Sequence, residues 1–127
     1  MGMDLRGNAP RSEAGRYLAF AGWRWAALVD LMHLVAPEEV MASTQWMYNS
    51  GDGLDDAGAV VVAAALAAAI EDGRAHHFIR QLPLKPVAIF PPVWDGTWRD
   101  GLARAITLAE VRQLVAFLRN SGGFEIW

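Results

Sequence analysis

The sequence contains no cysteine. This absence excludes a disulfide framework, a zinc site with thiolate ligands and a cysteine nucleophile. Clustered positive charge is also lacking, because the 11 lysine and arginine residues are spread along the chain among 14 aspartate and glutamate residues. Binding to a phosphate backbone depends on such clusters, so no nucleic-acid partner is expected.

No apolar run in the sequence is long enough to cross a bilayer. The longest, residues 57–70, is shorter than the about 20 residues that a membrane-spanning helix needs. Residues 1–17 are polar and of mixed charge, which predicts no secretory signal. We therefore expect a cytoplasmic protein without a membrane partner.

The composition predicts one folded domain. The 127 residues are 54% hydrophobic and include six tryptophans and five phenylalanines, which is ample material for a core. Residues 1–15 combine glycine, asparagine, proline and serine with few apolar side chains, as loose segments do. The predicted organisation is a flexible or extended N-terminal arm at 1–15 and a single helical domain at 16–127.

Apolar spacing and helix-ending residues predict the first helices. Residues 22–35 place apolar side chains at helical spacing and end before Pro37, since the residue before a proline is pushed out of the helical conformation. A second helix is predicted at 55–72 with Gly73 as its C-terminal cap, because glycine adopts the left-handed conformation without a side-chain penalty. A short helix follows at 74–81.

The last helix has the clearest boundaries. Thr107 and Glu110 fit a capping box, and Gly122 and Gly123 end the helix. Residues 124–127 alternate in polarity and could form a terminal strand beside residues 87–90. The predicted fold class is mainly α: a compact bundle of three principal helices plus a short fourth, with at most a small two-stranded β addition.

An acidic loop, WMYNSGDGLDD at residues 46–56, raises the question of a metal site. Counted from Asn49 or from Asp52, the sequence lacks the glycine and the glutamate that an EF-hand requires at its sixth and twelfth positions. A turn explains more of the residues, because Asp55 and Asp56 fall where a helix N-terminus needs acceptors. We expect a turn and a helix cap here, with no metal and no cofactor.

The helix after this loop carries no charged or hydrogen-bonding side chain between residues 57 and 70. A helix that is apolar all round is usually buried, and Val62, Leu66 and Ile70 form a bulky stripe along it. A central helix with close alanine packing is the first interpretation. The alternative is a homodimer face, so self-association of the protein is a further hypothesis.

The three histidines do not define a catalytic set. His76 and His77 are adjacent, so on a helix they lie about 100° apart and cannot hold one metal together. No glycine elbow surrounds a serine and no phosphate-binding loop is present, so no catalytic residue is assigned. His77 could still form an acid/base pair with Asp52 or Asp55 if folding brings them together, and His33 follows Asp30 by one helical turn.

Residues 83–101 are the best candidate for a recognition segment. Trp94-Asp95-Gly96 and Trp98-Arg99-Asp100-Gly101 nearly repeat one another, and each Asp-Gly indicates a turn. Tryptophan and arginine dominate the energetics of protein interfaces. The alternative is that the tryptophans fold inward as a cover for the core. The predicted partner-binding residues are Trp94, Trp98 and Arg99, together with Trp46, Tyr48 and Asp52 of the acidic loop.

Three short motifs carry a resemblance to known proteins. Gly22-Trp23 at a helix start, WMYNSGDG at 46–53 before an alanine-rich helix, and GGFEI at 122–126 resemble a group of small uncharacterised bacterial proteins. The resemblance covers about two-thirds of the chain and implies a bacterial or mobile-element origin and a compact, mostly helical domain. It implies no activity.

The function expected from the sequence is that of a small, non-enzymatic binding protein. It would meet a protein partner through residues 83–101, as an inhibitor, an immunity protein or an anti-defence protein does. Two alternatives stay open: a small hydrolase or ligand-binding enzyme that uses His76 or His77 with an aspartate, and a self-associating structural protein.

Overall fold

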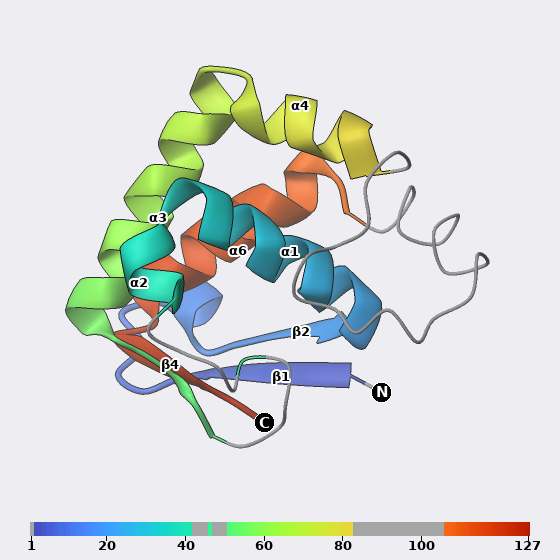
Figure 1. Ribbon diagram of the computed structural model, residues 1–127. Helices are drawn as coiled ribbons and strands as arrows, with labels where there is room; N and C mark the ends of the chain where they lie inside the picture. The colour runs from blue at the N-terminus through green and yellow to red at the C-terminus, as the bar shows by residue number, and fades with distance from the viewer. Residues whose placement is uncertain (1, 42–45, 47–50, 83–105) are drawn as a thin grey trace.

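The computed structural model describes residues 2–41, 46, 51–82 and 106–127 of the protein. Figure 1 shows two layers, a β-sheet and a set of helices on one of its faces. The strands are β1 (Gly2–Gly7), β2 (Tyr17–Ala21), β3 (Gly53–Asp55) and β4 (Gly123–Ile126). The helices are α1 (Gly22–Val35), α2 (Pro37–Met41), α3 (Asp56–Glu71), α4 (Arg74–Gln81) and α6 (Leu108–Asn120), with a short 3-10 helix, η1, at Glu13–Gly15.

The predicted mainly α bundle is wrong, because the protein has an α+β fold. Its four-stranded sheet has the order β2-β1-β4-β3, and every neighbouring pair is antiparallel. Both ends of the described chain lie in the centre of this sheet, where β1 pairs with β4. Helices that cover one face of an antiparallel sheet are the usual α+β solution for burying an apolar face.

The N-terminal residues form the strand on which this sheet depends. Met3 and Leu5 of β1 are buried, whereas Arg6 is exposed, so the strand alternates between the helices and the open face. Residues 2–7 of the expected arm are therefore extended and paired on both sides. The segment after them, at η1, packs on the end of α6, where a Cβ at Gly15 would overlap the Asn120 carbonyl.

Aromatic side chains join the sheet to the helices. Trp25 of α1 stacks against Phe20 of β2 and against Trp46, with ring centroids 6.3 and 6.1 Å apart. Trp46 and Phe117 each meet Phe124 of β4 edge to face, at 5.5 and 5.9 Å. Such pairs stabilise a core beyond the area that they bury. The cluster lies between the two layers and ties α1, α6 and β4 to one core.

The predicted helix boundaries in the described residues are confirmed. The Asp55 side chain accepts a hydrogen bond from the Gly58 N–H at 2.8 Å and so caps α3. The Thr107 hydroxyl caps α6 by accepting from the Glu110 N–H at 3.2 Å. Gly73 has a left-handed φ of 87°, which lets the chain turn directly from α3 into α4.

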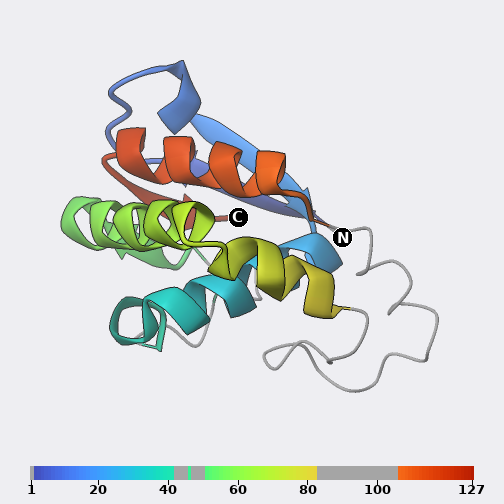
Figure 2. The ribbon, with the colours of Figure 1, turned by 90° about the horizontal axis from the view of Figure 1, so that it is seen from above.

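Helix α3 is central, but only one of its sides is buried. Its inward side consists of Ala59, Val62, Ala63, Leu66 and Ala69, and its outward side includes exposed Val60 and Val61. No helix in the described ranges is long and apolar enough to cross a membrane. Figure 2 shows α3 and α6 side by side above the sheet, with α1 and α4 on the other side of α3.

Candidate functional site

A cleft of about 570 Å³ lies between the second half of α1 and the length of α4. The short turn that joins α3 to α4 closes one end of it. The side chains and backbone that line it come from α1 (Asp30, His33, Leu34), from the turn (Asp72, Gly73) and from α4 and its end (Arg74, His77, Phe78, Gln81, Leu82). We refer to it as the α1–α4 cleft.

Helical spacing places these residues on facing surfaces. On α1, Asp30, His33 and Leu34 are separated by three and four positions, which puts them on one face. Arg74, His77, Phe78 and Gln81 repeat the same spacing on α4. Each helix thus carries polar and apolar side chains to the cleft, while its opposite face serves the core.

An ion pair fixes the cleft at the turn. The Asp72 carboxylate accepts hydrogen bonds from the backbone N–H of Arg74 at 2.9 Å and from its Nε at 2.8 Å. The backbone hydrogen bond is the main reason that the pKa of Asp72 is lowered. Desolvation opposes it, and the side-chain hydrogen bond and the charge of Arg74 lower the pKa further. Asp72 is therefore ionised and holds the guanidinium of Arg74 beside the cleft.

The remaining wall of the cleft is apolar. Leu34 has 58% of its surface exposed. Phe78 is half-buried against the core, and Leu82 is buried. The cleft thus combines an apolar surface with imidazole, amide, guanidinium and carboxylate groups at its sides. A ligand with an apolar body and a hydrogen-bonding head group would satisfy both parts.

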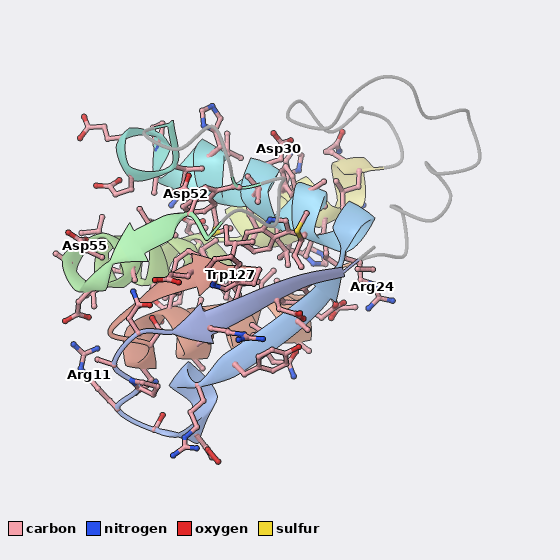
Figure 3. The ribbon with its side chains drawn as sticks, turned by 90° about the horizontal axis from the view of Figure 1, so that it is seen from below. Arg11, Arg24, Asp30, Asp52, Asp55 and Trp127 are labelled. Carbon is pink, nitrogen blue, oxygen red and sulfur yellow. The ribbon has the colours of Figure 1, made fainter. Side chains whose placement is uncertain are left out.

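His77 lies in this cleft, but the aspartates proposed for it from the sequence do not. Asp55 caps α3 at its N-terminus, and Asp52 accepts from the Gly53 N–H at 2.8 Å at the start of β3. Helix α3 has 16 residues, so it separates Asp55 from the α4 end of the molecule by about 24 Å. Figure 3 shows Asp52 and Asp55 away from α4. Among the described residues, the acids that share a cleft with His77 are Asp30 and Asp72.

Histidines 76 and 77 differ in position, although they are neighbours in sequence. Both are exposed, yet His77 is among the described residues that line the cleft and His76 is not. The turn of about 100° per helical residue explains the difference. This pair provides a matched comparison, with the same side chain on the same helix facing two directions.

Trp46 is not placed to contact a partner. Only 2% of its surface is exposed, and its carbonyl accepts a hydrogen bond from the indole Nε1 of Trp25 at 2.6 Å. It belongs to the aromatic cluster of the core. Asp52 is half-buried and is held in the sheet, where its carbonyl accepts from the Ile126 N–H at 2.7 Å.

The other predicted partner-binding residues, Tyr48, Trp94, Trp98 and Arg99, lie outside the described residues, as does the expected strand at 87–90. A protein partner that binds through residues 83–101 therefore stays a prediction. Leu82 lines the α1–α4 cleft and immediately precedes this segment in the sequence.

The sequence interpretation missed Leu34, Arg74 and Gln81 as members of a site. A signal was present in α4, whose sequence RAHHFIRQ repeats apolar and polar residues at helical spacing. Within the described residues, no three histidine, aspartate or glutamate side chains gather as a metal site requires. No protein-family model, curated protein or solved structure matches the chain.

Proposed function

We propose that the protein binds a small organic ligand in the α1–α4 cleft. The observation that carries this proposal is the form of the cleft. Its volume of about 570 Å³ falls within the range of about 300–1,000 Å³ that is typical of ligand sites. An apolar wall with a few convergent polar groups is also typical of such sites.

The polar groups favour a ligand that accepts hydrogen bonds. The guanidinium of Arg74 only donates hydrogen bonds. Its Nε donates to Asp72, and this contact fixes the orientation of the two terminal nitrogens. His33, His77 and Gln81 can donate as well. Leu34 and Phe78 supply apolar contact for the body of the ligand. A carboxylate or carbonyl attached to an aromatic or aliphatic group fits this arrangement.

Three compounds with the same ring and different head groups test the proposal: benzoate, benzamide and benzylamine. Each is titrated into ¹⁵N-labelled protein, and the backbone amide signals are followed by NMR. We expect benzoate and benzamide to shift the signals of residues 30–34 and 73–82, and benzylamine to do so less, because its head group only donates. Shifts spread over the surface, or shifts confined to other residues, would contradict the proposal.

A second candidate function is catalysis in the same cleft. It is favoured by one observation, that two imidazoles and the Asp30 carboxylate line a single cleft and could exchange protons with a bound substrate. The test is hydrolysis of p-nitrophenyl acetate and p-nitrophenyl phosphate by the protein. An activity that His77→Ala abolishes and His76→Ala retains would support catalysis. Equal rates of hydrolysis for the wild type and both variants would count against catalysis by His77.

A further inference from the structure

The β2 edge of the sheet has the features of a strand-pairing site. Among the strands in the described residues, β2 lies at one end of the sheet, with β1 beside it. Figure 3 shows β2 along the rim of the sheet. The sequence of the strand, YLAFA, contains no charged residue and no proline, which are the devices that usually block an edge from pairing.

The hydrogen-bonding pattern between β1 and β2 shows which backbone N–H and C=O groups of β2 face outward. The Gly7 N–H donates to the Arg16 carbonyl at 3.0 Å, so this pair exchanges hydrogen bonds across β1 and β2. Because bonded and non-bonded pairs alternate in an antiparallel ladder, Leu18 also turns its backbone groups toward β1. The N–H and C=O groups of Tyr17 and Ala19 therefore point away from β1, to the open edge.

Space and side-chain size also suit a further strand. A hollow of about 480 Å³ adjoins the edge and is lined by Ala19, Phe20 and Ala21 together with Arg24, Glu110 and Gln113. Ala19 is exposed and small, so another backbone can approach it closely. The opposite edge is different, since β3 has only three residues and ends at the charged cap Asp55.

We propose that β2 pairs antiparallel with β2 of a second copy, about a two-fold axis at Ala19. This arrangement brings Ala19 opposite Ala19 of the other copy, and Leu18 opposite its Phe20. The two four-stranded sheets become one continuous sheet, and no like charges face each other within the new pair of strands. The strand is thus complementary to itself. Pairing of the two β2 strands uses the β2 edge of both copies, so the assembly stops at an isologous dimer.

The ends of the paired strands also come near each other. In this register η1 of one copy approaches the start of α1 of the other copy. Among the described residues, no side chain caps α1, and its first turn contains no acidic residue. The Glu13 side chain is 84% exposed and forms an ion pair with Arg16 at 3.2 Å, so it would bring an ion pair, and not an isolated negative charge, to this helix start. This inference does not depend on the ligand proposed for the α1–α4 cleft.

Molar mass in solution tests the dimer. Light scattering coupled to size exclusion, over a hundredfold range of loading, should give 13.9 kDa for a monomer or 27.8 kDa, twice that value, for the dimer. We expect the wild type to approach the dimer mass as its concentration rises. A monomer at every concentration would overturn the proposal.

Two variants test the interface itself. Ala19→Pro removes an N–H that faces away from β1, so it should leave the β1–β2 ladder intact. Because it removes both backbone hydrogen bonds between the two Ala19 residues, we expect the dissociation constant of the dimer to rise at least about tenfold. Ala19→Lys places two like charges side by side at the axis and should have the same effect. Far-UV circular dichroism verifies that both variants are folded.

A control distinguishes this edge from the exposed side of α3. Val60→Lys changes an exposed apolar residue of α3 and should leave the dimer unaltered. Loss of the dimer in Val60→Lys, with the dimer retained in both Ala19 variants, would assign the interface to α3 and overturn the proposal. Amide exchange gives an independent readout: protection of the Ala19 N–H should disappear on dilution. Protection that persists at every dilution would mean that the chain covers its own edge, and would also overturn it.

Discussion

The two sides of helix α1 show how one element serves two different environments. On the side that faces the sheet, Leu28, Leu31 and Met32 are fully buried. On the other side, Asp30, His33 and Leu34 line a cleft that α4 does not fill. The first surface meets apolar partners from α3 and the strands, whereas the second faces both polar and apolar side chains of α4 across the cleft. The difference indicates that the core determines stability, while the cleft is available for binding.

The largest effect is expected from a substitution in the core. Phe117 of α6 is fully buried and packs edge to face against Phe124. Phe117→Ala should lower the free energy of unfolding by about 3–5 kcal/mol, because the lost apolar contact is joined by the cost of a cavity. Urea unfolding measures it. A loss of unfolding free energy below about 1 kcal/mol would contradict the view that the buried core, and not the cleft, determines stability.

A moderate effect is expected at the start of α3. Asp55→Ala removes the acceptor for the Gly58 N–H and should cost about 1 kcal/mol of unfolding free energy. Asp55→Asn should cost much less, because asparagine caps helices as well as aspartate does. Thermal unfolding of the two variants measures the difference. Equal losses would show that the charge of Asp55, and not its capping hydrogen bond, is what matters at this position.

A small effect on stability with a clear effect on binding is expected in the cleft. Leu34 is more than half exposed, so Leu34→Ala should change the free energy of unfolding by less than about 0.5 kcal/mol. The same substitution removes part of the apolar wall and should weaken benzamide binding by about threefold to tenfold. Urea unfolding and NMR titration measure the two quantities. Unaltered binding would exclude Leu34 from the site.

The smallest effect concerns the ionisation of Asp72. Because the folded pKa of Asp72 is lowered, its stabilising contribution is complete above the unfolded value of about 3.9 and is lost as the pH falls through the folded pKa. Arg74→Ala keeps the backbone N–H that is the main cause, so it should raise the pKa of Asp72 only partly. A ¹³C NMR titration of the carboxyl group measures it. A return to the ordinary value would assign the shift to the guanidinium instead.

The helices were predictable because their ends carry local signals. Asp55, Gly73 and Thr107 act on backbone groups within four residues of themselves, so the sequence around each is sufficient to recognise it. The packing of α3 followed in the same way from its unbroken apolar sequence. What the pattern could not show was which side of this helix stays exposed, because exposed positions such as Val60 and Val61 are as apolar as the buried ones.

The sheet was missed because its strongest pairings are remote in sequence. Strand β1 lies beside β4 at the opposite end of the chain, and the register of Leu5 with Ile126 has no local signal. The alternation of Met3 and Leu5 with polar residues was too short to stand out among glycine, asparagine and proline. The five residues of β2 are apolar on both sides and lack a clear alternation.

The cleft was predictable only in part. His77 was a candidate from the start, but its neighbours were not, because Asp30 and His33 lie on a helix more than 40 positions earlier. The position of α4 across the cleft from α1 depends on the turn at Gly73, whose direction in space is a property of the whole fold. Sequence spacing could therefore show which residues share a helix face, but not which two faces meet.

The most direct test of the account compares the two adjacent histidines of α4. The dissociation constant of benzamide is measured by NMR titration for the wild type, His77→Ala and His76→Ala. We predict that His77→Ala weakens binding by about tenfold, through the loss of one hydrogen bond and its contact area, while His76→Ala stays within about twofold of the wild type. Equal affinities for all three proteins, or a larger loss in His76→Ala, would contradict the assignment of the α1–α4 cleft as the binding site.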